Sequence, residues 1–176
     1  MDFQDYVRDL PLLHHWSGSW NTGGFSSEQL RALHQFLSNR MPESATLLET
    51  GAGNSTITML FLSPAKLISI APEQYLFDRI HAFCRANDIP THALEAYFDG
   101  SQGVLPKLAA DSRFSEPTLD FALVDGCHSW PKCFVDLEYS NTMLKRGGYL
   151  LVDNCTASRK WPAYWSSIPR SRWILI

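Results

Sequence analysis

The stretch Leu47–Thr56, LLETGAGNST, decides the fold. An apolar run ends in the acid Glu49, and after Thr50 come Gly51-Ala52-Gly53 and three small polar residues. Buried strands of parallel sheets are continuous apolar runs, and a Gly-rich turn lets such a strand pass directly into a helix around a ligand. The stretch therefore predicts a strand, a tight turn and a helix that together form a ligand site.

Apolar segments alternate with amphipathic ones on both sides of this stretch. Ser26 and Gln29 have the spacing of a helix capping box, and Lys145-Arg146-Gly147 is typical of a helix C-terminus. The alternation predicts one α/β domain with a mostly parallel sheet and helices on both faces. We expect strands over 45–50, 66–71, 91–98, 118–126 and 148–154, and helices over 26–40, 55–62, 73–87, 103–110 and 131–146. The first 25 residues are aromatic and loop-like.

Composition narrows the class of protein. The chain has 176 residues, which suits one domain, with 45% hydrophobic and 19% charged residues. A net charge of -3 without a long basic run does not indicate a nucleic-acid partner, and no apolar segment approaches the roughly 20 residues of a membrane span. The N-terminus lacks a signal-peptide layout, so we expect a cytoplasmic protein. The four cysteines lack CxxC spacing and are expected to be free thiols.

Acids and small polar residues follow most of the predicted strands, where open α/β sheets bind their ligands. A phosphate-binding Walker loop is excluded at Gly51–Thr56 because it has no lysine. A dinucleotide loop has a third glycine where this chain has Thr56, and Glu49 would repel a pyrophosphate. Glu49 instead suits a ligand that carries an ammonium and a sulfonium group, such as S-adenosylmethionine.

Three motifs together resemble a known family. Glu49 to Thr56 resembles motif I of the class I S-adenosylmethionine-dependent methyltransferases. FDGSQGVLPKL (98–108), and FALVDGCHSW (121–130) with GGYLLVDN (147–154), resemble segments of small-molecule, catechol O-methyltransferase-like O-methyltransferases. The resemblance runs from about Ser26 to Asn154. It implies a Rossmann-like methyltransferase fold with a cofactor-binding core over 26–154, an N-terminal lid or extension over 1–25 and a short Trp-rich tail over 155–176.

The resemblance also implies residue roles. The cofactor-binding residues would be Glu49, Gly51, Gly53, Asn54, Ser55, Glu73, Ser101, Gln102 and Asp125. Asp125, Asp153 and Asn154 match the positions that bind Mg²⁺ in the metal-dependent members, and such oxygen ligands suit a hard cation. His128 is the candidate catalytic base because an imidazole pKa near 6.5 suits proton abstraction, and Lys132 is the second candidate. In similar enzymes the segment before the first strand covers the substrate, which makes Trp16, Trp20 and Phe25 lid candidates.

The chain departs from the family pattern in two places. Family members carry an acid at the end of the second strand to hold the ribose, whereas this chain has Ala71 there and Glu73 two residues later. After Asn154 the family continues with a helix and two strands, the last antiparallel, but only 22 residues remain and RWILI supplies one strand at most. Either the sheet is trimmed at this edge or the sequence ends early, and an uncovered Trp-rich tail would favour a homodimer.

Other interpretations of these residues remain open. The two glycines would also suit a simple tight turn, and Asp153-Asn154 would also suit a helix N-cap. His128 could hydrogen-bond within its loop, or it could form a zinc site with Cys127 and Cys155. The favoured function is methyl transfer from S-adenosylmethionine to an oxygen of a small molecule, assisted by a divalent metal. The rivals are a nicotinamide-dependent oxidoreductase and a non-catalytic binding protein that kept the fold.

Overall fold

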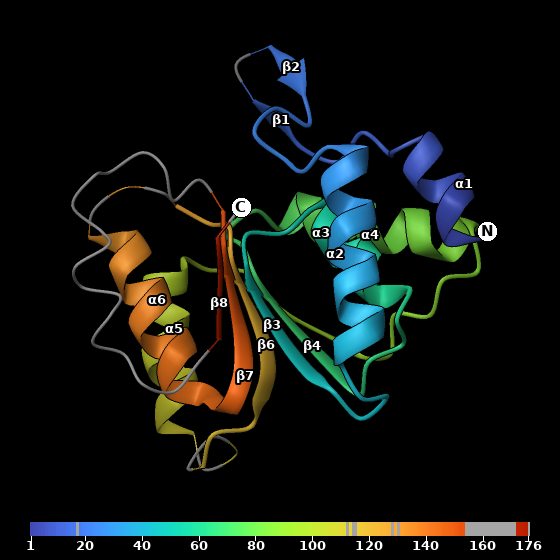
Figure 1. Cartoon of the computed structure of the whole chain (residues 1–176). Coiled ribbons are helices and arrows are strands. Elements are labelled where there is room, and N and C mark those ends of the chain that lie inside the picture. The colour runs from blue at the N-terminus through green and yellow to red at the C-terminus, as the bar shows by residue number, and fades with distance from the viewer. Residues whose placement is uncertain are drawn as a thin grey trace.

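A parallel sheet forms the centre of the molecule (Figure 1). The computed structural model describes residues 1–16, 18–111, 113, 116–127, 129, 131–153 and 172–175, with backbone alone for Trp16 and residues 172–175. Within this part of the chain the strand order is β5-β4-β3-β6-β7-β8, and every pairing is parallel. The strands are β3 Thr46–Thr50, β4 Lys66–Ile70, β5 Leu94–Tyr97, β6 Leu119–Val124, β7 Leu144–Val152 and β8 Arg172–Leu175.

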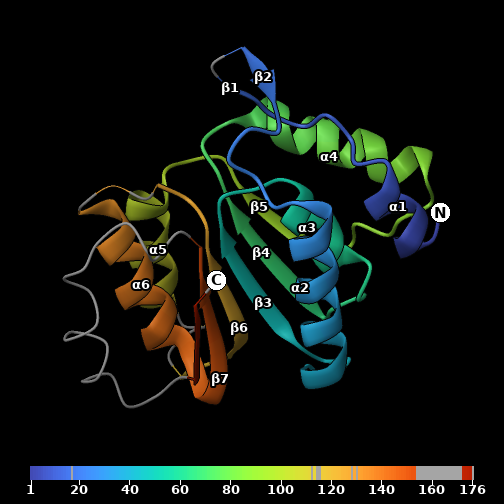
Figure 2. The ribbon, with the colours of Figure 1, turned by 45° about the horizontal axis from the view of Figure 1, so that its top comes forward.

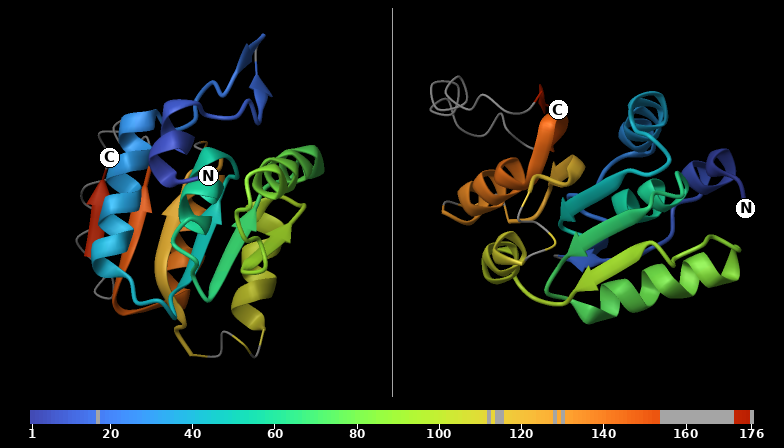
Figure 3. Two further views of the ribbon diagram at one scale, coloured as in Figure 1. Left: turned by 90° about the vertical axis from the view of Figure 1, so that its right-hand side faces the viewer. Right: turned by 90° about the horizontal axis from the view of Figure 1, so that it is seen from below.

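Helices cover both faces of the sheet, as the sequence predicts (Figure 3). One face carries α1 Phe3–Arg8, α2 Ser27–Arg40, α3 Asn54–Leu60 and α4 Gln74–Ala86, and the other carries α5 Ser101–Ala110 and α6 Lys132–Met143. Successive strand residues point to opposite faces, so Leu47 packs in the cluster under α1–α4 and Leu48 in the cluster under α5 and α6. The two clusters confirm the predicted α/β class.

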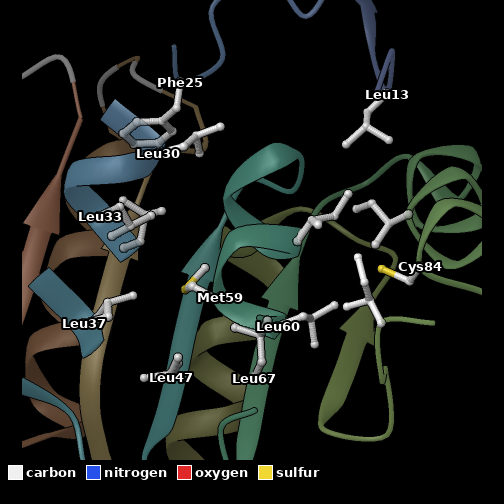
Figure 4. Packing of buried hydrophobic residues seen from close by; sticks show 14 of the residues in the cluster. Leu13, Phe25, Leu30, Leu33, Leu37, Leu47, Met59, Leu60, Leu67 and Cys84 are labelled. Atoms are coloured by element: carbon white, nitrogen blue, oxygen red, sulfur yellow. The ribbon is translucent and has the colours of Figure 1, made fainter. Parts of the chain in front are cut away.

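The larger of the two clusters joins the helices to β3 and β4. Leu30, Leu33 and Leu37 recur along one side of α2 and are buried against Leu47 and its neighbours, as Figure 4 shows. The predicted amphipathic pattern of this helix is therefore confirmed. Met59 and Leu60 of α3, also drawn in Figure 4, are buried in the same cluster. Their burial packs the helix that follows the Gly-rich turn against the rest of the core.

The N-terminal cap of α2 is a capping box. Gln29 N donates to Ser26 Oγ at 3.2 Å, and Ser26 N donates to Gln29 Oε1 at 2.9 Å. Removing the hydroxyl in Ser26→Ala leaves one helix-end amide without its partner and is expected to lower the free energy of unfolding by about 1 kcal/mol. Urea denaturation checks this value, and an unchanged midpoint would show that the cap contributes nothing to stability.

The N-terminal residues differ from the loop-like prediction. Residues 3–8 form α1, with the Asp2 side chain accepting from Asp5 N at 2.8 Å, and His15–Trp16 and Ser19–Trp20 form an antiparallel hairpin, β1 and β2. A helix of six residues is too short to show a helical period in sequence, and it is stable here because Tyr6 and Val7 are buried. Phe25, a lid candidate, is a core residue beside Leu30 (Figure 4).

The β1–β2 hairpin projects beyond the end of the sheet toward which the strand arrows point (Figure 3). Figure 2 shows it above α4. The Trp20 ring is 41% exposed, and the Arg79 guanidinium of α4 lies 4.6 Å from its centroid. Arg79 Nη1 also donates to Leu12 O at 3.0 Å, which holds the base of the hairpin to α4. The hairpin is therefore the part of the predicted lid that borders the carboxyl ends of the strands.

The junction of α6 and β7 also differs from its prediction. The helix ends at Met143, not at Arg146, and β7 begins at Leu144. Pairing with β6 shifts register between Leu119↔Leu144 and Phe121↔Tyr149, so the extra residues of β7 form an irregular segment with Gly147 at φ +83°. The helix end predicted at Lys145-Arg146-Gly147 is therefore wrong, because these residues belong to the strand that pairs with β6. Lys145 Nζ donates to Asp120 Oδ1 at 2.7 Å.

The C-terminal stretch supplies one strand, as the sequence allows. β8 lies beside β7 and runs parallel to it, whereas the family pattern ends in an antiparallel strand. Most of the Trp-rich tail, residues 155–171, lies outside the described residues, so the homodimer stays a prediction. No helix in the described part of the chain combines the length and the apolarity needed to cross a membrane.

Candidate cofactor site at the strand ends

Three of the predicted site residues, together with Ala71, form one row just past the strands. Gly51 N donates to Ile70 O at 2.9 Å, Ala71 N to Tyr97 O at 3.1 Å, Asp125 N to Thr50 O at 3.0 Å and Asp153 N to Val124 O at 3.0 Å. These bonds continue the sheet by one residue in each strand. Gly51, Ala71, Asp125 and Asp153 therefore lie side by side at the carboxyl edge, where ligands of open parallel sheets bind.

Gly51 is required by the backbone on two grounds. Its φ is +88°, a conformation that side chains rarely adopt. A Cβ at this position would lie 2.9 Å from the carbonyl carbon of Asp125 and closer still to its oxygen. The first glycine of the turn therefore lets the end of β3 pass against the end of β6.

Gly53, unlike Gly51, is not required by its φ angle or by a close contact. Its φ of 168° is extended backbone, and a Cβ there would meet no atom of the described part of the chain within 4 Å. The turn therefore has an open side at Gly53, directly before α3. A surface that the protein leaves open above a Gly-rich turn fits a bound ligand.

Glu49 is fully buried and points into the protein. Its carboxylate accepts hydrogen bonds from Ser55 Oγ at 2.8 Å, Thr56 Oγ1 at 2.5 Å and Ser69 Oγ at 2.6 Å. Burial raises the pKa of Glu49 to about 7, and the three hydroxyls oppose this rise. The acid that the sequence assigns to the cofactor therefore binds the turn and the neighbouring strand β4.

Thr56 connects the two ends of the turn. While its hydroxyl donates to Glu49, it accepts from Gly53 N at 3.0 Å. Thr56 occupies the position at which a dinucleotide motif has its third glycine. In the structure its hydroxyl fixes the turn. Ser69 is a second residue missed by the sequence analysis, and the available signal was a hydroxyl within the apolar strand KLISI.

Asn54 and Ser55 begin α3 and are buried. Ser55 uses its hydroxyl on Glu49, and Asn54 accepts from Tyr6 Oη through both its main-chain O, at 2.8 Å, and its side-chain Oδ1, at 3.0 Å. Both side chains therefore hold the turn from its inner side, opposite the open side at Gly53.

The acids that follow β6 and β7 form a pair. Burial, followed by the charge of the neighbouring Asp153 and a side-chain hydrogen bond with it, raises the pKa of Asp125 to about 9. Two adjacent carboxyls at one edge share a proton or bind a cation. His128 and Asn154, the predicted base and the predicted third metal ligand, lie outside the described residues.

No group of three His, Cys, Asp or Glu side chains suited to a metal occurs within the described ranges. His128 and Cys155 of the zinc alternative lie outside the described residues, so this alternative stays untested, and Cys84, Cys127 and Cys133 are free thiols.

Lys132 lies beside the loop that follows Asp125. It is exposed at the first position of α6. A hydrogen bond from Ser129, at 2.9 Å between Sγ and Oγ, lowers the pKa of the Cys127 thiol, and the Lys132 charge contributes in the same direction. Lys132 therefore lies near enough to influence the electrostatics of this loop.

Asp136 is a functional candidate that the sequence analysis missed. It is fully buried on α6, and a Cβ at Gly126 would lie 3.3 Å from its Oδ2. The signal was present as an acid at an inward position of the helix, between Cys133 and Ser140. This carboxylate lies against the loop that follows Asp125, the first acid of the pair.

The predicted adenine and ribose positions lie at the other end of the row. Ser101 is buried at the start of α5, and the exposed Gln102 folds its amide back over Gly100, where a Cβ would lie 2.5 Å from Nε2. Ala71 is buried. Glu73 is exposed at the N-cap of α4 and makes no capping hydrogen bond with its side chain. Glu73 is therefore placed to reach a ligand from the start of α4.

A cavity of about 470 Å³ lies away from the Gly-rich turn. It is lined by residues of β5, of α5 and of the segment after α5, among them Tyr97, Lys107 and Arg113. Arg113 is paired with Glu95 at 3.1 Å and with Asp111 at 3.1 Å. These charged pairs cover the outer side of the edge strand β5.

The comparisons with known proteins agree on the fold. No family model and no curated protein matches the chain. Among solved structures, the O-methyltransferase TomG from Streptomyces achromogenes, involved in tomaymycin synthesis and solved with SAM, is 20% identical with a TM-score of 0.61, over 73% of this chain and 56% of its own.

Two further structures have the same fold. An rRNA methylase from Streptococcus thermophilus is 17% identical with a TM-score of 0.52, over 68% of this chain and 66% of its own. The [4+2]-cyclase SpnF is 17% identical with a TM-score of 0.51, over 84% of this chain and 56% of its own. The chain thus spans little more than half the length of TomG and of SpnF. It has the fold of the class I S-adenosylmethionine-dependent methyltransferases, which the sequence predicts.

Proposed function

We propose that this chain binds S-adenosylmethionine over the Gly51–Ser55 turn and transfers its methyl group to an oxygen of a small molecule. The observation that carries the proposal is the turn itself. It is open at Gly53 on the ligand side, and on its inner side the buried Glu49 holds it through Ser55 and Thr56. A turn that is rigid before the ligand arrives avoids the entropy cost of ordering it on binding.

The row of strand ends supplies the remaining contacts. Glu73, Ser101 and Gln102 stand on the side proposed for the nucleoside, and Asp125 and Asp153 on the side proposed for the reacting end. When bound, S-adenosylmethionine supplies an electrophilic methyl group. The protein then has to align an acceptor oxygen with that group and remove its proton, which makes positioning the main source of rate.

We also propose that Asp125 and Asp153 hold a divalent cation such as Mg²⁺, with Asn154 as a further ligand. The support is the contact between two carboxyls, which favours a shared proton in its absence and a hard cation in its presence. A cation there would lower the pKa of a bound acceptor hydroxyl. His128 and Lys132 remain the candidate bases.

The acid pair makes a prediction for Mg²⁺. Calorimetric titration of Mg²⁺ into the wild type is expected to give a binding heat accompanied by proton release, which is measured by repeating it in buffers of different ionisation enthalpy. Asp153→Asn should lose this heat because it removes one of the two charges. Equal Mg²⁺ heats for both proteins would contradict a metal at this pair.

A small-molecule acceptor is favoured over a nucleic acid by the net charge of -3 and the lack of a basic run. TomG, involved in tomaymycin synthesis, illustrates such chemistry on this fold, and the rRNA methylase shows that the fold also serves RNA. Charge is the feature of this chain that separates the two classes of substrate.

The cofactor class is tested by thermal unfolding with two ligands. S-adenosylhomocysteine at 100 times its Kd is expected to stabilise the protein by about 2.7 kcal/mol, or roughly 5 to 10 °C in Tm, while NAD⁺ at the same concentration leaves Tm unchanged. A shift with NAD⁺ alone would favour the oxidoreductase. Binding of S-adenosylhomocysteine without methyl transfer from S-adenosylmethionine to any of a panel of catechols, sugars and carboxylic acids would favour the non-catalytic protein, for which Ala71 is the supporting observation.

A further inference from the structure

We infer that Tyr6 is a positioning residue for the cofactor turn, so that the N-terminal helix α1 contributes to cofactor affinity without touching the cofactor. The inference rests on the proposed function. Its basis is a buried contact between segments 48 residues apart, in which Tyr6 Oη donates to Asn54 O at 2.8 Å and Asn54 Oδ1 at 3.0 Å.

Tyr6 has a fixed place under the turn. Its side chain is 0% exposed, and its ring packs against Phe61, at 5.3 Å between centroids, and Phe83, at 5.9 Å. Because the ring is buried and packs against two other rings, the hydroxyl has one position. That position is the first residue of α3, immediately after the open Gly53.

Different residues hold different parts of the turn. Glu49 holds Ser55 and Thr56 from the side of β3 and β4, but no hydrogen bond joins it to Asn54 among the described contacts. Asn54 is instead held by Tyr6 through both of its oxygens. Without the Tyr6 hydroxyl, the residue between Gly53 and Ser55 would keep its helical hydrogen bonding but lose the bond that orients its side chain inward.

Helix α1 has attachments that do not involve this hydroxyl. The Phe3 ring stacks on His34 at 3.8 Å between centroids, Arg31 Nη1 donates to Gln4 Oε1 at 2.7 Å, and Val7 is buried in the core. Removing the Tyr6 hydroxyl alone should therefore leave α1 docked. This separates an effect on the turn from an effect on the packing of the helix.

The test compares Tyr6→Phe with Val7→Ala, a matched variant that loosens α1 without touching Asn54. Losing a buried hydrogen bond to Asn54 is expected to raise the Kd for S-adenosylhomocysteine about tenfold in Tyr6→Phe. Val7→Ala should keep a Kd within about twofold of the wild type even where its Tm falls as far or further, because it removes core packing but keeps the Tyr6 hydroxyl that binds Asn54. Equal effects of the two variants on Kd would overturn the inference.

A readout without ligand keeps the inference separate from the proposed function. Amide hydrogen exchange over residues 53–56 of the ligand-free protein is expected to be about tenfold faster in Tyr6→Phe than in Val7→Ala. If the wild type bound no S-adenosylhomocysteine, the proposed function would fail while the exchange result still decided whether Tyr6 orders the turn. Unchanged exchange in Tyr6→Phe would show that the hydroxyl does not hold Asn54.

Discussion

Gly53→Val is expected to weaken binding of S-adenosylhomocysteine about 100-fold while leaving the protein folded. A Cβ at this position meets no atom of the described residues within 4 Å, so Tm should stay within about 2 °C of the wild type. The added methyl groups would occupy the space that we assign to the cofactor. An overlap of about 3 kcal/mol corresponds to a Kd raised roughly 100-fold.

The first glycine of the turn provides the control. Gly51→Ala forces a side chain onto a backbone at φ +88° and against the Asp125 carbonyl, so it should lower the free energy of unfolding by about 2 kcal/mol or more. The two glycines are thus expected to separate, one acting on binding and the other on stability. A Gly53→Val protein that binds S-adenosylhomocysteine as the wild type does would contradict a cofactor above this turn.

Glu49→Gln is expected to remove much of the pH dependence of stability below neutral pH. Burial raises the pKa of Glu49 from 4.5 to about 7, so the folded protein keeps a proton that the unfolded chain releases. The resulting stabilisation is complete below pH 4.5 and is lost as the pH rises through about 7. The loss amounts to about 3 kcal/mol for this single group.

A glutamine at position 49 does not titrate, so the variant lacks this loss. Urea denaturation of the ligand-free proteins at a series of pH values measures it, and the difference between wild type and Glu49→Gln isolates Glu49 from other acids such as Asp125. The three hydroxyls of Ser55, Thr56 and Ser69 can rotate to accept from the amide, which keeps the variant folded. Parallel pH profiles of the two proteins would show that folding does not raise the pKa of Glu49.

The sequence predicts the central part of the fold because its signals are local and consistent. The apolar run before Glu49, the turn at Gly51 and the helix after it were all foreseeable, and β3 and α3 begin within one residue of their predicted positions. The predictions of two other features were wrong, for identifiable physical reasons. Helix α1 depends on tertiary burial of Tyr6, and the α6–β7 junction depends on pairing with β6, which no local pattern encodes.

The site was predictable in its position more than in its contacts. Parallel strands end at one edge, so Gly51, Asp125 and Asp153 had to lie in one row. The direction of the Glu49 carboxylate had no signature in the sequence, and neither did the second role of Thr56. The link from Tyr6 to Asn54 joins residues 48 positions apart, which a single sequence cannot reveal.

The most direct test of the account is a calorimetric titration of the wild-type protein with S-adenosylhomocysteine. We predict saturable binding of one ligand per chain with a micromolar Kd, despite the buried Ala71 in place of a ribose-binding acid. No heat of binding from a protein whose circular dichroism shows it to be folded would contradict cofactor binding at the Gly51–Ser55 turn, and with it the proposed methyl transfer.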